Sequence, residues 1–125
     1  MLIGYDLDDW CNYQLKLPIN VELPKICHFL ITGNSGSGKS HSLKYILWQI
    51  AKSTNADLWL FDFKHSNDFN FLEGTPRYRS ADNCICGIEE FYDYFTNVRQ
   101  GHIKNIRQNI LVIDEYPSLI LYLSN

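Results

Sequence analysis

Residues 33–40, GNSGSGKS, fit the phosphate-loop pattern G-x-x-x-x-G-K-S/T at every fixed position. A triphosphate needs a concave row of backbone N–H donors, and three glycines let this backbone approach the phosphates closely. Lys39 would reach the β- and γ-phosphates, and the hydroxyl of Ser40 would hold Mg²⁺. The stretch therefore predicts a nucleoside triphosphate site. The expected contacts are Gly33, Asn34, Ser35, Gly36, Ser37, Gly38, Lys39, Ser40 and His41.

The loop has two alternative interpretations, a glycine-rich turn without a ligand and a dinucleotide-binding fingerprint. The fingerprint requires a third glycine where the chain has His41, and Lys39 followed by Ser40 is typical of triphosphate sites. An apolar run, Cys27–Thr32, precedes the loop, and an amphipathic pattern follows it. This strand, loop and helix context favours the triphosphate.

Two carboxylates, Asp114 and Glu115, follow the apolar run ILVI. Asp114 would lie at the end of a strand and join the Mg²⁺ shell, while Glu115 would polarise a water for attack on the γ-phosphate. An apolar run followed by Asp also occurs by chance at ordinary strand ends, but the upstream phosphate loop favours the catalytic interpretation. The predicted catalytic residues are Glu115 and Lys39, and the predicted metal ligands are Ser40 and Asp114.

A second strand end carries charge, because LWLF is followed by Asp62 and then by Lys64. In an open parallel sheet, ligands bind beyond the carboxyl ends of the strands. These two side chains therefore belong near the nucleotide or near a subunit boundary, unless they are solvated charges of an ordinary turn.

The hydrophobic pattern alternates between buried strands and amphipathic helices. The expected strands are 27–32, 56–63 and 109–116, and the expected helices run from the glycine loop to about residue 53 and over roughly 84–100. Pro117 can open a further short helix, and residues 64–79 form a polar loop in this interpretation. The alternation predicts an α/β fold with a parallel sheet.

The chain is predicted to be a single domain over residues 1–125, with a lead-in at 1–25 and a nucleotide-binding core at 26–125. Within the lead-in, Met1–Tyr5 and Tyr13–Leu17 are short extended pieces that would form a small edge hairpin.

The bulk composition is that of an ordinary globular domain, with 46% apolar and 20% charged residues. The net charge of -3 gives no general attraction to nucleic acid, and a solvated loop is the favoured explanation of a basic cluster before the last strand. This cluster consists of Arg99, His102, Lys104 and Arg107.

No apolar run approaches the roughly 20 residues of a membrane span. Four cysteines without a C-x-x-C pair indicate reduced packing thiols in a cytoplasmic protein rather than a zinc site.

Three segments, CHFLITGNSGSGKS, LWLFDFK and ILVIDEY, stand in the order typical of the FtsK/SpoIIIE family of DNA-translocating ATPases. The chain resembles that family, including FtsK-like proteins of conjugative elements, over about residues 25–118. It departs at Phe63, where the family usually has Pro. His28, Asp62 and Lys64 also match motif positions. The resemblance implies a RecA-like, additional-strand P-loop fold that uses ATP and Mg²⁺.

The resemblance further implies a homo-oligomer, a hexameric ring that threads double-stranded DNA during conjugative transfer or chromosome movement. Family members continue past the acidic pair, and their next strand inserts between the loop strand and the acidic strand. We therefore expect this chain to be an incomplete part of the motor domain that is inactive alone and exposes apolar surface along Leu119–Leu123.

Two other functions stay open. A small P-loop kinase would need an acceptor site and an Arg-rich lid, yet residues 64–79 offer only Arg77 and Arg79, and Glu115 would have no evident use. A non-hydrolysing nucleotide-binding protein would keep the glycine loop and lack catalysis.

Overall fold

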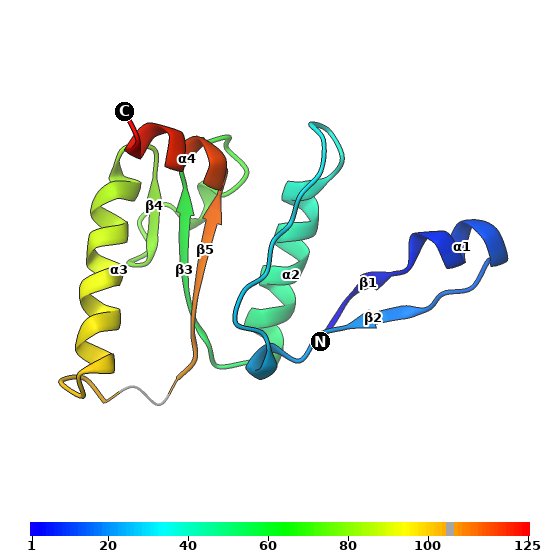
Figure 1. The fold of residues 1–125 in the computed structure, drawn as a ribbon, viewed down its shortest axis with the longest axis horizontal. Helices are drawn as coiled ribbons and strands as arrows, with labels where there is room; N and C mark the ends of the chain where they lie inside the picture. Colours follow the sequence, from blue (N-terminus) through cyan, green and yellow to red (C-terminus); the bar gives the residue numbers. More distant parts are fainter. Residues whose placement is uncertain (105–106) are drawn as a thin grey trace. The chain divides into compact units, whose positions relative to one another are not determined.

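A computed structural model describes residues 1–104 and 107–125 of the chain. The chain separates into two compact units, Met1–Thr54 and Asn55–Asn125. Figure 1 shows the elements of each unit, coloured along the sequence. That the whole chain is a single domain stays a prediction. Among the described residues, no helix is both long and apolar enough to cross a lipid bilayer.

The first unit begins with two antiparallel strands, and a short helix lies between them along the chain. The elements are β1 (Leu2–Tyr5), α1 (Leu7–Tyr13), β2 (Pro18–Asn20) and a 3₁₀ turn, η1 (Leu23–Lys25). The side chain of Asp6 caps α1 by accepting a hydrogen bond from the backbone N–H of Asp9 at 3.0 Å. The prediction of an extended Tyr13–Leu17 is therefore wrong, because the capped helix includes Tyr13 and strand pairing starts only at Pro18.

The apolar run before the glycine loop, residues 27–32, is not a strand in this structure. Phe29 is half exposed and Leu30 is 80% exposed. A strand exists only where its backbone N–H and C=O groups bond to a neighbour, and none of the strands in the described ranges pairs with this run. The predicted buried strand is therefore wrong here, although the run is as apolar as a core strand.

The helix α2 (Lys39–Ser53) starts directly after the glycine loop, as predicted. Ile50 on its apolar face is buried, and α2 contacts β1 within the first unit. The helix ends where the backbone N–H and the hydroxyl of Thr54 both donate to the carbonyl of Ile50, at 3.0 and 2.8 Å. The predicted boundaries of this helix are confirmed.

The second unit is built on a three-stranded parallel sheet in the order β4-β3-β5. Its strands are β3 (Asp57–Asp62), β4 (Tyr78–Ser80) and β5 (Asn109–Asp114), with a 3₁₀ turn, η2 (Asn70–Leu72), between β3 and β4. Strands β3 and β5 confirm two predicted strands, and the predicted α/β fold with a parallel sheet is confirmed. The last four residues of β3 are buried as expected, whereas β5 is at the edge of the three-stranded sheet and is only partly buried, so its predicted full burial is wrong. β4 lies in the stretch predicted as loop, because three residues are too few to show a hydrophobic period.

The helix α3 (Asn83–Arg99) packs against β3 and β4 and closes the core of the second unit (Figure 1). The core consists of Trp59, Phe61 and Cys84, with Ile88, Phe91 and Tyr94 packed against them. The helical spacing of Ile88, Phe91, Tyr92, Phe95 and Val98 predicts that these side chains share one buried face, but Tyr92 and Phe95 are exposed. The buried face of the helix is offset from the predicted one, so that Tyr94 meets Trp59 with ring centroids 5.5 Å apart.

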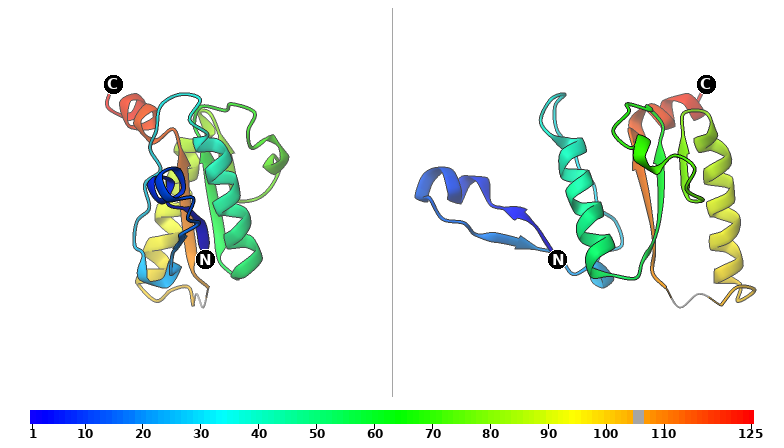
Figure 2. Two further views of the ribbon diagram at one scale, coloured as in Figure 1. Left: turned by 90° about the vertical axis from the view of Figure 1, so that its right-hand side faces the viewer. Right: turned by 180° about the vertical axis from the view of Figure 1, so that it is seen from behind.

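The last helix, α4 (Tyr116–Leu123), follows β5 after one residue and has Pro117 in its first turn, as predicted. It lies across the carboxyl ends of the strands of the second unit (Figures 1 and 2). Leu119 packs inward with 1% exposure, so its predicted exposure is wrong. The expected apolar surface is confirmed at the four residues that follow. They are Ile120, Leu121, Tyr122 and Leu123.

The basic cluster before β5 is exposed at each of its residues, Arg99, His102, Lys104 and Arg107. Arg107 lies 3.6 Å from the carboxylate of Asp57 at the start of β3. Residues 105–106 of the predicted loop lie outside the described residues. The exposure agrees with the solvated loop that was favoured from the sequence.

Replacing Gly87 of α3 with alanine is expected to destabilise the chain by about 1–2 kcal/mol. A Cβ there would lie 2.8 Å from the ring of the fully buried Phe61 and 2.7 Å from Cγ of Arg79, and the resulting strain outweighs the better helix propensity of alanine. Thermal or urea unfolding measures the change. Asp93→Ala on the exposed face of α3 is the matched control and should not lower stability. Equal stability of Gly87→Ala and wild type would contradict this packing.

Candidate functional site

The glycine loop of the first unit adopts a left-handed backbone conformation at two of its glycines. Gly36 and Gly38 have φ values of 78° and 90°, in the left-handed region that other residues rarely adopt. A Cβ on Gly33 would lie 2.6 Å from Oγ of Ser37. Gly38 is the N-cap of α2, and no side chain caps this helix. The N–H groups of its first turn are thus available to a ligand, and the helix dipole favours an anion.

Lys39, the first residue of α2, folds back onto the loop. Its Nζ donates hydrogen bonds to the carbonyls of Gly33 at 2.7 Å and Asn34 at 2.9 Å. A turn within the loop is closed by the N–H of Ser37, which donates to the carbonyl of Asn34 at 3.1 Å. An ammonium, a helix N-terminus and the Ser40 hydroxyl in the first turn form a donor set that fits a phosphate chain.

In the second unit, the carboxyl ends of β3 and β5 bring two carboxylates together. The strand register places Asp62 opposite Asp114. Asp62 is fully buried, and its carboxylate accepts hydrogen bonds from the backbone N–H of His65 at 2.9 Å and from the hydroxyl of Tyr78 at 3.3 Å. Burial raises the pKa of Tyr78 to about 12, and the charge of Asp62 adds to the shift. The phenol therefore stays protonated and keeps donating to Asp62.

Asp114 is half buried beside two other acids. Burial raises the pKa of its carboxyl above the ordinary value, the charges of Asp62 and Glu115 raise it further, and a hydrogen bond from the backbone N–H of Glu115 opposes them. A carboxylate that is partly desolvated next to like charges is stabilised by a bound cation. Its oxygen donors also match the preference of Mg²⁺ for carboxylate.

Glu115 stands at the junction of β5 and α4 with φ of 59°, a left-handed value that is uncommon for a residue with a side chain. Its Oε1 lies 3.8 Å from Nζ of Lys64, in the turn after β3. The two strand ends that the sequence marked separately, DFK and DE, are therefore brought together by the β3–β5 register.

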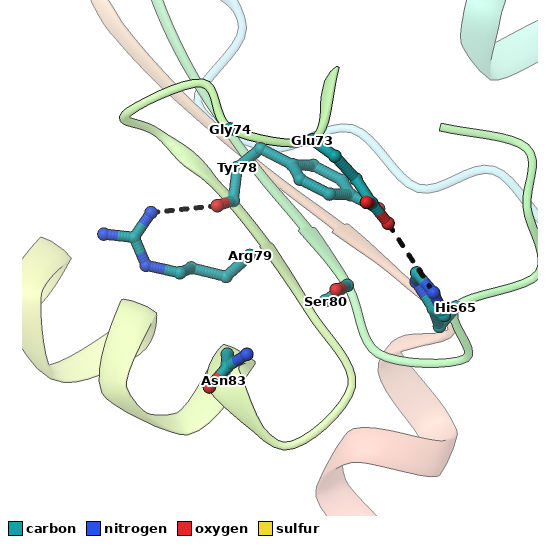
Figure 3. Close-up of a pocket in the computed structure, with 7 residues that line it drawn as sticks. All are labelled: His65, Glu73, Gly74, Tyr78, Arg79, Ser80 and Asn83. Carbon is teal, nitrogen blue, oxygen red and sulfur yellow. Dashed lines mark hydrogen bonds and ion pairs between the residues drawn. The ribbon is translucent and has the colours of Figure 1, made fainter. Parts of the chain in front are cut away.

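Next to this edge lies a shallow, open pocket of about 280 Å³, shown in Figure 3. It is lined by His65, Glu73, Gly74, Tyr78, Arg79, Ser80 and Asn83. Nε2 of His65 lies 3.7 Å from the carboxylate of Glu73, and Nη1 of Arg79 donates to the carbonyl of Tyr78 at 2.9 Å. Sequence reasoning missed the contacts of His65 and Tyr78 with Asp62, because no motif links residues of a loop to a three-residue strand.

The sequence-predicted residues thus fall into two groups. The loop residues, Lys39, Ser40 and His41 all belong to the first unit, whereas Asp62, Lys64, Asp114 and Glu115 belong to the second. His28 is exposed in the unpaired run before the loop. Within the part of the chain that the structure describes, no cluster of three or more His, Cys, Asp or Glu could hold a metal ion by itself. In phosphoryl-transfer sites, Mg²⁺ is commonly held by one or two carboxylates together with phosphate oxygens of the substrate.

A parallel α/β sheet and a glycine loop that opens a helix define the class of the chain as a P-loop NTPase fold. The model of the family described as DUF87, Helicase HerA, central domain, matches residues 12–118, and the chain belongs to this family. No curated protein and no solved structure matches the chain. The family is a P-loop ATPase family related to FtsK and HerA. The resemblance seen in the sequence is therefore confirmed as membership of this broader group of P-loop ATPases.

Proposed function

We propose that the chain binds ATP with Mg²⁺ and serves as the nucleotide-binding part of a DNA-translocating ATPase. The observation that carries the proposal is the loop before α2, where two left-handed glycines, an uncapped helix start and the Lys39 ammonium form an anion-binding donor set. Membership of the HerA central-domain family supports the assignment of this anion as a nucleotide.

Each residue has a separate role in this proposal. Backbone N–H groups of the loop and Lys39 bind the phosphates, and the Ser40 hydroxyl and Asp114 hold Mg²⁺. Mg²⁺, when bound, neutralises charge on the phosphate oxygens. Glu115 accepts a proton from the attacking water as general base. The order of the motifs along the chain supports assigning both groups of residues to one nucleotide.

The finer parts of the proposal rest on the family and on the resemblance to FtsK-like proteins. They are double-stranded DNA as the partner, a hexameric ring, work in conjugative transfer or chromosome movement, and a cytoplasmic location. The description of the family as a helicase central domain supports a nucleic acid partner.

The test uses the natural, full-length protein. ATP binding is titrated with and without Mg²⁺, and phosphate release is measured with and without linear double-stranded DNA. We expect Mg²⁺-dependent binding and phosphate release that DNA accelerates. Failure to bind ATP would refute the proposal. Binding without hydrolysis would favour a non-hydrolysing protein, and transfer of phosphate to a small acceptor would favour a kinase.

Replacing Asp114 with asparagine is expected to have opposite effects on stability and on binding. Because the pKa of Asp114 is raised in the fold, stability is lost as the pH rises from the ordinary carboxyl pKa to the raised one, and the full cost is present above it. Asp114→Asn should therefore raise the melting temperature of the nucleotide-free protein at pH 7, and this gain should shrink at acid pH, where the wild-type carboxyl is itself neutral. The same variant should bind ATP with less dependence on Mg²⁺. Calorimetry at two pH values and a Mg²⁺ titration measure both, and a lower melting temperature at pH 7 would contradict the assigned electrostatics.

A further inference from the structure

The turn after β3 presents a lysine to the candidate general base. Nζ of Lys64 and Oε1 of Glu115 lie 3.8 Å apart, and both residues belong to the second unit. Their meeting follows from the parallel register, which aligns Asp62 with Asp114 and so brings the two residues beyond the strand ends to one edge. Lys64 is 63% exposed and Glu115 is 34% exposed at their side chains. The pair is therefore open to solvent on the lysine side and more enclosed on the carboxylate side.

The backbone that carries Lys64 is fixed on both sides. Asp62, two residues before Lys64, is fully buried. Its carboxylate accepts a hydrogen bond from the backbone N–H of His65, the residue after Lys64. The same carboxylate accepts the hydroxyl of Tyr78 on β4, so the turn is tied to the neighbouring strand. Figure 3 shows His65 and Tyr78 beside the same pocket. The left-handed φ of 51° at His65 marks a tightly specified turn rather than a loose loop.

The distance between Nζ of Lys64 and Oε1 of Glu115 indicates whether the lysine orients the carboxylate or blocks it by a direct hydrogen bond. At 3.8 Å the atoms are within ion-pair range, but they are too far apart for a hydrogen bond. A lysine that sequestered the carboxylate would donate to it at about 2.7–2.9 Å and occupy its lone pairs. Here the ammonium attracts the carboxylate while leaving its lone pairs able to accept a proton from water.

We propose that Lys64 is a positioning residue that orients the Glu115 carboxylate for water activation, through a turn that Asp62 anchors. The inference rests on the proposed function, because it assigns Lys64 to the same hydrolysis reaction. Lys64 contacts Glu115 and acts through it, so its removal changes the rate of hydrolysis rather than the affinity for ATP.

The experiment compares Lys64→Met, Lys64→Arg and wild type in steady-state ATP hydrolysis with Mg²⁺ and DNA. Lys64→Met should lower kcat about tenfold, in line with the cost of misplacing a catalytic group, and should change KM less than about twofold. Lys64→Arg keeps the charge and should restore most of kcat. The control is Lys25→Met, which removes the lysine of an exposed ion pair with Glu22 in the first unit and should leave both constants unchanged.

A double-mutant cycle with Glu115→Gln identifies the route of the effect. In that background Lys64→Met should cause no further loss of kcat, because the carboxylate that it orients is absent. If Glu115→Gln slows hydrolysis but Lys64→Met does not, the inference fails and the proposed function stands. Additive losses would also overturn it, since Lys64 would then act independently of Glu115. If the wild-type protein hydrolyses no ATP, both the proposed function and the inference are refuted.

Discussion

Replacing Lys39 with alanine is expected to abolish ATP binding or to weaken it by at least about 100-fold. Hydrogen bonds to charged groups contribute about 1.5–3 kcal/mol each, and the lysine is proposed to contact two phosphates. A loss of about 2.7 kcal/mol already corresponds to 100-fold in affinity. The variant also removes the two hydrogen bonds from Nζ to the carbonyls of Gly33 and Asn34, so the loop itself loses a restraint.

A titration of ATP in the presence of Mg²⁺ measures this effect. Lys52→Ala is the matched control, because Lys52 is an exposed lysine at the other end of α2, where its Nζ lies 4.8 Å from the centre of the Trp48 ring. That variant should bind ATP normally. Unchanged affinity of Lys39→Ala would refute the assignment of the glycine loop as a phosphate site.

Replacing Glu115 with glutamine is expected to leave ATP binding intact and to slow hydrolysis by about 100- to 10,000-fold, the range that general-base catalysis contributes. The amide has nearly the same shape, so the left-handed backbone at the junction of β5 and α4 is undisturbed. It cannot take up the proton of an attacking water. Asp114, which is proposed to hold Mg²⁺, is unchanged in this variant.

Binding and single-turnover phosphate release separate the two steps. Glu89→Gln, at an exposed position on α3, makes the same chemical change away from the strand ends and should behave as wild type. Hydrolysis at the normal rate by Glu115→Gln would show that Glu115 is not the base. The phosphate loop would still stand in that case, since its role depends on different residues.

The sequence alone determined the features that depend on local pattern. The glycine loop, the start of α2 at Lys39 and the strands β3 and β5 were all predictable, because a loop motif, a helical period and apolar runs are each contained in neighbouring residues. The candidate site residues were found in the same way, from charges that directly follow those runs. The class of fold followed from the alternation of strands and helices.

Only the tertiary structure decided which of these residues meet. β4 gains its strand conformation by pairing with β3, and the apolar run at 27–32 lacks a strand because no described neighbour bonds to it. The buried Asp62 accepts a hydrogen bond from the hydroxyl of Tyr78, and Lys64 lies within ion-pair range of Glu115. Both contacts depend on the register of strands that are distant in the sequence. Register is a property of paired backbones, so its consequences, the meeting of two strand ends and the burial of one carboxylate, cannot be obtained from the pattern of a single segment.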